Sequence, residues 1–181
     1  MGLITLGVFA INDLGLDGSV LQMVNHGLIS TTLFLLAGMV ERRTLTGELD
    51  RLGSMARGRP LLATVLMTTG IIALAVPLSS AFAGEFLILA GVLRRGWGWA
   101  AVGAVAIVLA AMYMLRLISA VLHRDVGPAV SDAALDLRPA ELGVTVPLVA
   151  CLLALSVYPA AITQHSFRSD RAQADVAQGF R

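Results

Sequence analysis

Residues 60–95 read PLLATVLMTTGIIALAVPLSSAFAGEFLILAGVLRR and decide the fold that we expect for this chain. Arginine residues lie at both ends of the apolar part of the stretch, and Glu85 is the one ionisable side chain between them. A continuous helix of this length would be about 50 Å long, whereas the hydrocarbon core of a bilayer is only about 30 Å thick. Two complete spans of about 20 residues each would need more chain. We therefore predict one membrane span with a break in it.

The same stretch contains residues suited to form the break. Pro77 removes a backbone donor, and the hydroxyls of Ser79 and Ser80 can satisfy backbone groups that the break sets free. Gly84 then precedes Glu85. A discontinuous helix that carries a carboxyl is a form in which transporters build ion sites, and an ionisable group inside a span is costly enough to suggest a function. The alternative is a neutral carboxylic acid that is hydrogen-bonded within the bundle.

The composition excludes an ordinary soluble domain. The chain has 181 residues, of which 57% are hydrophobic and only 14% are charged, whereas soluble domains are about 25% charged. A formal net charge of +1 gives no indication of a nucleic-acid partner. Cys151 is the single cysteine and lies in an apolar run, so we predict an inert, packed thiol.

The order of apolar and polar segments predicts an all-α, polytopic transmembrane bundle with one discontinuous helix. The bundle is expected over 1–163 and a polar tail over 164–181. Its predicted segments are a partial helix at 1–11, a polar turn at 12–17, and spans at 19–40, 60–93 (broken near 77–82), 100–122 and 139–159. The connections 41–59 and 123–138 carry more arginines than the opposite ends, which favours the cytoplasmic side for them.

Polar residues in the first complete span are arranged as a stripe. Ser19, Gln22, His26 and Ser30 are spaced three, four and four residues apart, which places them on one helix face, and Asn25 flanks that face. Such a stripe should face protein or water rather than lipid. Two interpretations remain open: hydrogen bonds that hold the bundle together, or a hydrated proton path in which His26 accepts and releases protons near neutral pH.

Arg116 is the other charged residue well inside a predicted span. Its side chain could extend toward the nearby membrane interface, or it could pair with a carboxylate elsewhere in the bundle. The three histidines are not spaced as metal ligands, and no phosphate-binding loop or CxxC motif occurs. We therefore expect no metal and no cofactor in this chain.

The stretch from Gln22 to Pro60 resembles a known family. The chain is similar to the C-terminal part of the M-type (chain 4-like) antiporter-like subunit of respiratory complex I, the proton-translocating NADH:quinone oxidoreductase. The residues that carry the resemblance are His26-Gly27, Glu41-Arg42-Arg43, Thr44-Leu45-Thr46, Leu52-Gly53-Ser54, Gly84-Glu85-Phe86, Leu137-Arg138-Pro139-Ala140-Glu141 and Val157-Tyr158-Pro159. The sequence departs from the family where Val76, Leu78 and Ser79 replace glycines that are usual around the proline of the break.

The resemblance implies a function for two residues. Glu85 matches the carboxylate at the far end of the subunit's half-channel, and His26 matches a histidine on its hydrophilic axis. It also implies a translocase subunit without redox chemistry of its own, in the bacterial inner (plasma) membrane. Its expected partners are other membrane subunits, the lipid bilayer, protons and the N-terminal half of the fold, since the family has about fourteen spans. We expect a fragment, a split-gene product or a mis-called start, stable only beside other subunits.

Two alternatives differ in function class. The same module could belong to a cation/proton antiporter or a membrane-bound hydrogenase complex. The chain could instead be a non-transporting, truncated remnant with a purely structural role. Gly84-Glu85-Phe86 favours the complex I subunit over the first alternative.

Overall fold

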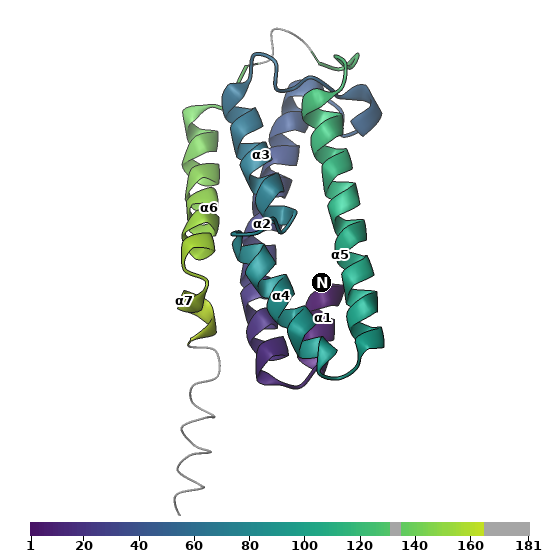
Figure 1. Ribbon diagram of the computed structural model, residues 1–181. Coiled ribbons are helices and arrows are strands. Elements are labelled where there is room, and N and C mark those ends of the chain that lie inside the picture. The colour runs from purple at the N-terminus through teal and green to yellow at the C-terminus, as the bar shows by residue number, and fades with distance from the viewer. Residues whose placement is uncertain (131–134, 165–181) are drawn as a thin grey trace, which may run out of the picture.

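Helices make up all the regular structure in the part of the chain that the computed structural model describes, residues 1–130 and 135–164 (Figure 1). The prediction of an all-α bundle is confirmed. The elements are α1 (Gly2–Phe9), α2 (Asp13–Thr44), η1 (Leu49–Arg51), α3 (Pro60–Ala73), α4 (Ser80–Leu93), α5 (Trp97–Ile118), the π-helical turn η2 (Ser119–His123), α6 (Pro139–Val157) and α7 (Ala160–Thr163). Apart from Gln164, the predicted tail lies outside the described residues.

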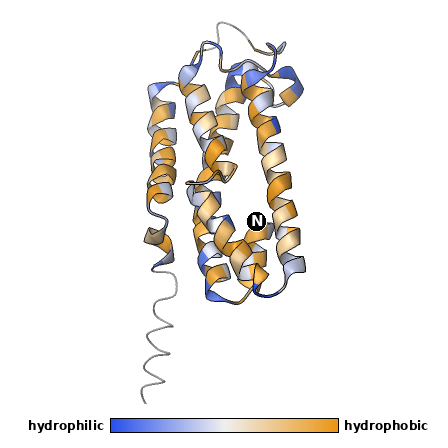
Figure 2. Cartoon of the chain, in the orientation of Figure 1, coloured by the Kyte–Doolittle hydropathy of each residue, from blue (hydrophilic) through white to orange (hydrophobic). Residues whose placement is uncertain are grey.

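Three of these helices are long and apolar enough to cross a membrane: α2, α5 together with η2, and α6. The shorter apolar helices α3 and α4 follow one another end to end beside α2 (Figure 1). Hydrophobic residues dominate along the helices, whereas hydrophilic residues gather at the two ends of the bundle (Figure 2). Together α3 and α4 therefore form one crossing with an interruption at its middle.

The interruption covers residues 74–79, three residues earlier than the sequence suggested. Ala75 and Leu78 adopt the left-handed conformation, with φ of 50° and 79°, so the chain leaves the helix before it reaches Pro77. Non-glycine residues adopt this conformation at a cost of about 1 kcal/mol each. Ser79 then caps α4, because its Oγ accepts a hydrogen bond from the Phe82 N–H at 3.1 Å.

The helix α2 begins six residues before the expected span at 19–40, so the predicted turn at 12–17 is wrong. Asn12 caps α2 by accepting a hydrogen bond from the Gly15 N–H at 2.9 Å. Its Nδ2 also donates to the carbonyl of Gly91 at 2.8 Å, which ties this end of α2 to the end of α4. The polar residues that suggested a turn instead supply a helix cap and the first helical turn.

Glycines bring the backbones of α2 and α4 into direct contact. A Cβ at Gly18 would lie 2.7 Å from the Ile88 nitrogen and 2.9 Å from the Gly84 oxygen. A Cβ at Gly91 would lie 2.4 Å from the Gly15 nitrogen. Real Cβ atoms do not approach backbone atoms this closely, so the two helices can only pack in this way with glycine at these positions.

We predict that Gly18→Ala separates α2 from α4 and destabilises the bundle. The added methyl group meets backbone atoms that cannot rotate away, and overpacking of this kind costs about 1–3 kcal/mol. Thermal unfolding in detergent would measure the loss. Gly27→Ala is the matched control, because no heavy atom lies within 4 Å of a Cβ at Gly27. Equal melting temperatures for the two variants would contradict the predicted close contact.

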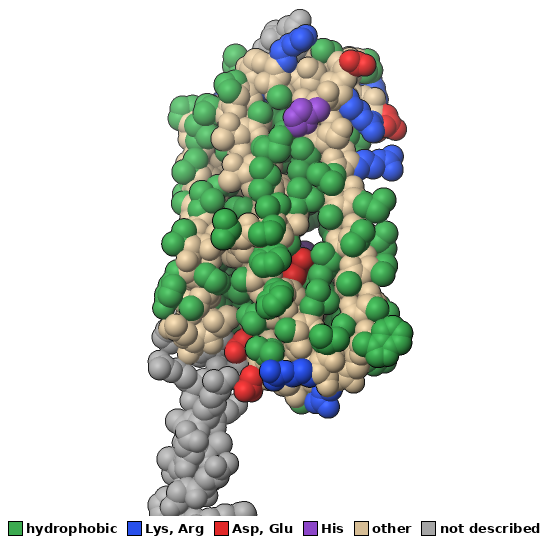
Figure 3. All heavy atoms as spheres, viewed as in Figure 1, with side chains coloured by type: hydrophobic (Ala, Val, Ile, Leu, Met, Phe, Trp, Pro, Cys, Tyr) green, Lys and Arg blue, Asp and Glu red, His purple; other side chains and the backbone are tan. Residues whose placement is uncertain are grey.

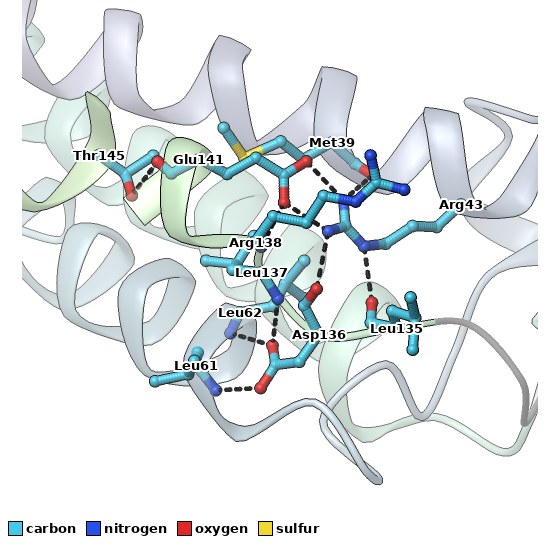
Figure 4. Close-up of polar contacts among 10 residues, drawn as sticks. All are labelled: Met39, Arg43, Leu61, Leu62, Leu135, Asp136, Leu137, Arg138, Glu141 and Thr145. Carbon is cyan, nitrogen blue, oxygen red and sulfur yellow. Dashed lines mark hydrogen bonds and ion pairs between the residues drawn. The ribbon is translucent and has the colours of Figure 1, made fainter. Parts of the chain in front are cut away.

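At the opposite end of the bundle, Arg43 joins α2 to α6. Its Nη1 and Nη2 donate to the Glu141 carboxylate at 3.1 Å and 2.5 Å (Figure 4). Its Nε and Nη2 also donate to the carbonyls of Leu135 and Asp136, at 2.8 Å and 3.0 Å. The side chains of Arg43 and Glu141 are only 9% and 16% exposed, so this bidentate pair is largely shielded from water.

We predict that Arg43→Gln destabilises the chain by about 3 kcal/mol, because it leaves the Glu141 carboxylate partly buried without its cation. Thermal unfolding in detergent would again measure the effect. Arg42→Gln is the matched control, since Arg42 is the exposed neighbour on the same helix. A similar loss in both variants would mean that overall charge, rather than the buried pair, causes the destabilisation.

Asp136 caps the N-terminus of α3, although it lies more than 70 residues away in the sequence. Its carboxylate accepts hydrogen bonds from the N–H groups of Leu61 and Leu62 at 2.9 Å and 3.0 Å (Figure 4). Burial alone would raise the pKa of this carboxyl, but the hydrogen bonds from Leu61, Leu62 and Leu137 and the nearby charge of Arg43 hold the pKa below its ordinary value. The loop before α6 therefore fixes the start of the broken span.

We predict that Asp136→Asn lowers stability by about 1 kcal/mol at neutral pH, the typical value of a helix cap. Because the pKa is lower in the folded than in the unfolded chain, the contribution is complete above about pH 4 and is lost as the pH falls through the folded value. Unfolding of both proteins across this range should show their difference disappear in acid. Asp50→Asn is the control, because Asp50 is 88% exposed. A difference that persists at low pH would contradict the charge-dependent cap.

Candidate functional site

A cavity of about 790 Å³ lies between α5 and the α2–α4 pair, at the level of the interruption, and residues of α1 also line it. Most of its lining is apolar. Figure 3 shows an opening in this face of the molecule with hydrophobic side chains around it. The polar and ionisable side chains in the lining are Gln22, His26, Ser30, Glu85 and Tyr113. The structure thus brings three members of the predicted stripe to the same cavity as the predicted carboxylate.

Glu85 reaches the cavity from the second turn of α4 and is partly buried there. In the described part of the chain its carboxyl makes no hydrogen bond and no ion pair. Because α4 begins at Ser80, the interruption places this carboxyl just after a helix start in the middle of the crossing. A carboxyl in such a position can exchange a proton with water in the cavity.

The α2 side of the cavity carries His26, Gln22 and Ser30. Gln22 lies against α4, since a Cβ at Gly84 would be 2.6 Å from its Oε1. The hydroxyl of Ser30 donates to the His26 carbonyl at 2.6 Å, so its oxygen remains available as an acceptor. His26 is half-buried, and its imidazole offers two ring nitrogens that can donate or accept hydrogen bonds.

The fourth member of the stripe, Ser19, and the flanking Asn25 lie elsewhere. Ser19 is fully buried, and its hydroxyl lies 3.0 Å from the Ile4 carbonyl and 2.7 Å from the Gly15 carbonyl, where it helps to join α1 to α2. Asn25 is also fully buried but does not line the cavity. The stripe therefore divides into a packing residue, Ser19, and three residues that line the cavity, whereas the flanking Asn25 is buried outside the cavity.

Four further residues that the sequence singled out are Pro77, Ser79, Ser80 and Arg116. Pro77 lies in the interruption, Ser79 caps α4, and Ser80 is fully buried at the first position of α4. Arg116 is exposed and makes no ion pair within the described residues. It does not line the cavity, so the structure does not bring it to Glu85.

Two side chains were not expected in their observed places. Tyr113, which was not among the predicted site residues, lines the cavity from α5. Cys151 is exposed on α6, so the prediction of a packed thiol is wrong: its helix presents this face away from the bundle. Within the described residues no group of three His, Cys, Asp or Glu side chains could hold a metal ion.

The fold and the cavity define a class: a multi-pass helical membrane protein with one interrupted crossing and ionisable groups in an internal cavity. Residues 1–112 match the family model described as NADH:quinone oxidoreductase/Mrp antiporter, TM. This match covers more than half of the chain, and the chain therefore belongs to that family.

Relatives of known name support a finer assignment within the family. The chain is 37% identical over 174 residues to NAD(P)H-quinone oxidoreductase chain 4 1 of Synechococcus sp. (strain JA-3-3Ab), covering 91% of this chain and 33% of that protein. It is 33% identical over 162 residues to NADH-quinone oxidoreductase subunit M of Rickettsia prowazekii, covering 90% of this chain and 33% of that protein. The resemblance to M-type subunits is confirmed. The chain spans about a third of the length of these relatives.

Two solved structures share the fold. Respiratory complex I from Thermus thermophilus with bound NADH contains a chain with a TM-score of 0.81 and 29% identity, covering 89% of this chain and 34% of that chain. The Mrp complex from Dietzia sp. DQ12-45-1b contains one with a TM-score of 0.74, covering 90% of this chain and 38% of that chain. Because the second match is only 22% identical, it supports the fold alone.

Proposed function

We propose that this chain forms the C-terminal half-channel of a proton-translocating membrane subunit of an NADH:quinone oxidoreductase. The observation that carries the proposal is the shared cavity: Glu85 from the interrupted crossing and His26 from α2 line the same space. A carboxyl and an imidazole can each bind and release a proton, and the cavity is large enough for water to connect them.

Each group has a distinct task in this mechanism. Glu85 is the principal proton-exchanging residue. A carboxyl in a low-dielectric region must be either protonated or paired with a positive charge, so its ionisation depends strongly on the charges around it. His26 passes the proton along the wall that α2 forms. Gln22 and Ser30 hydrogen-bond the intervening water and keep it in position without changing their own protonation.

The relatives support the oxidoreductase over the antiporter alternative. Those at 33% and 37% identity carry the names of NADH- or NAD(P)H-quinone oxidoreductase subunits, whereas the likeness to the Mrp complex extends to the fold alone. Redox chemistry would take place in other subunits, and this chain would contribute proton movement.

The expected surroundings follow from the same comparison. The chain would act within a multi-subunit complex in the bacterial inner (plasma) membrane, beside other membrane subunits and the part of the fold that its relatives have in addition. The exposed apolar faces of α5 and α6 suit contact with lipid or neighbouring helices. The proposal therefore concerns the assembled complex.

We predict that Glu85→Gln keeps the complex assembled but slows proton transfer through this chain by about 100-fold, the low end of what a positioned acid–base group contributes. Glu85→Asp should retain part of the activity, and His26→Ala should do less harm, because water can replace one relay member. Proton uptake into vesicles coupled to NADH oxidation is the measurement.

Glu41→Gln is the matched control, because it makes the same chemical change at an exposed position on α2. It should pump as the unmodified complex does. Unmodified pumping by an assembled Glu85→Gln complex would overturn the proposal and leave Glu85 as a structural carboxylic acid.

A further inference from the structure

Arg116 is a charged residue inside a crossing that the proposed proton path does not use. It lies on α5 seven residues before His123, which is about 10 Å of helix from the end of that crossing. Its side chain is exposed, it does not line the cavity that contains Glu85, and it makes no ion pair within the described residues. The cavity mechanism therefore does not account for this charge.

Arg116 belongs to a helix face that the described residues leave uncovered. The helix α5 packs mainly against α3 and α4 and forms one edge of the bundle (Figure 1). Away from these contacts, exposed residues recur every three or four positions of α5, so they lie in one row. This row is the outer face of α5, and it consists of Val105, Val108, Met112, Arg116 and Ser119, none of which lines the cavity.

Most of the outer face is apolar, and Arg116 is its one charged residue. Val105, Val108 and Met112 are each more than half exposed, as are side chains that contact acyl chains or another apolar helix. A charged side chain on a surface that faces only hydrocarbon is strongly unfavourable and rare, and charged groups inside crossings are usually paired. The charge of Arg116 therefore indicates an anionic partner outside the described residues.

The direction of the side chain favours one kind of anion. Each Cα–Cβ bond of an α-helix is tilted toward the helix N-terminus. The helix α5 begins at Trp97, at the far end of the crossing, so the Cα–Cβ bond of Arg116 points away from the nearer lipid headgroups. A headgroup phosphate would have to be reached against this tilt, whereas a carboxylate on a neighbouring crossing can lie at the depth of Arg116.

The surroundings of Arg116 are also suited to bind a carboxylate. Ser119 lies one turn further on the outer face, where its exposed hydroxyl can donate a hydrogen bond to the same anion. At the nearer end of the crossing, Asp50 already pairs with Arg124 at 3.3 Å. A guanidinium commonly binds a carboxylate through two parallel hydrogen bonds, so such a pair would fix the position of a neighbouring helix against α5.

We propose that the outer face of α5 docks a membrane helix from outside this chain, and that Arg116 pairs there with an Asp or Glu side chain of that helix. The proposal rests on the proposed function only in placing the chain within a multi-subunit membrane complex. Arg116 then contributes to assembly rather than to proton movement, and the apolar residues of the outer face supply the remaining contact.

The direct test is a cryo-electron microscopy map of the assembled complex. We expect a carboxylate from outside this chain within about 4 Å of the Arg116 guanidinium, the usual limit for an ion pair. The helix that carries it should contact Val108 and Met112. A lipid phosphate at Arg116, or an outer face that contacts only lipid, would overturn the proposal.

The variant Arg116→Leu distinguishes a docked helix from a lipid-facing surface. Leucine would leave the partner carboxylate in the membrane without its cation, which strongly disfavours assembly. We therefore expect less intact complex on native gels after detergent extraction. If the outer face contacts only lipid, leucine removes a charge from hydrocarbon and leaves the amount of intact complex unchanged or increased. That result would overturn the proposal.

The matched control is Arg124→Leu, which makes the same change at the end of the crossing. Arg124 and its partner Asp50 are both exposed, and such pairs contribute little, so this variant should assemble normally. An equal loss of complex in both variants would mean that overall charge matters rather than the proposed pair, and would overturn the proposal.

A third variant, Arg116→Lys, tests whether the charge itself is required. It keeps the cation and should retain part of the assembly that Arg116→Leu loses, and an equal loss in these two variants would overturn the charge pair. Failure of the proposed function is distinguishable, because it appears as unmodified pumping in Glu85→Gln. The amount of intact complex in the Arg116 variants does not depend on pumping.

Discussion

Inside a hydrocarbon layer, every backbone N–H and C=O outside a helix must form a hydrogen bond within the protein. In this chain the requirement applies to residues 74–79, which interrupt the crossing formed by α3 and α4. Ser79 satisfies one donor at the start of α4, and Ser156 of α6 accepts from another. The left-handed residues Ala75 and Leu78 are tolerated because these contacts fix the start of α4, and the Leu74 N–H bonds the Gly70 carbonyl at 2.9 Å at the end of α3. The cavity that contains Glu85 lies at the level of this interruption.

Both ends of the interrupted crossing are held by contacts between distant parts of the chain. The carboxylate of Asp136 caps the start of α3, and Arg43 fixes the same loop to α2 and Glu141. At the other end, Asn12 bonds the Gly91 carbonyl where α4 ends. With its two outer ends fixed, the crossing can keep an irregular middle without losing its position against α2.

The close approach of α2 and α4 determines which polar groups share a space. Glycine contacts at Gly18 and Gly91 set the register between the two helices. That register turns His26 and Glu85 to the cavity, whereas Asn25 is fully buried outside it.

The sequence by itself determined the all-α membrane class, the interrupted crossing and Glu85 as its carboxyl, because hydrophobic length and the cost of a buried charge are properties of local sequence. It did not determine the start of α2, since a polar Asn12 suits a turn and a helix cap equally well. Only the tertiary structure decided that Arg43 binds Glu141, that Ser19 packs against α1 while His26 lines a cavity, and that Cys151 faces outward. The physical reason is that helix periodicity shows only which residues share a helix face. The partners of each residue depend on the register between helices, and glycine contacts between distant segments fix that register.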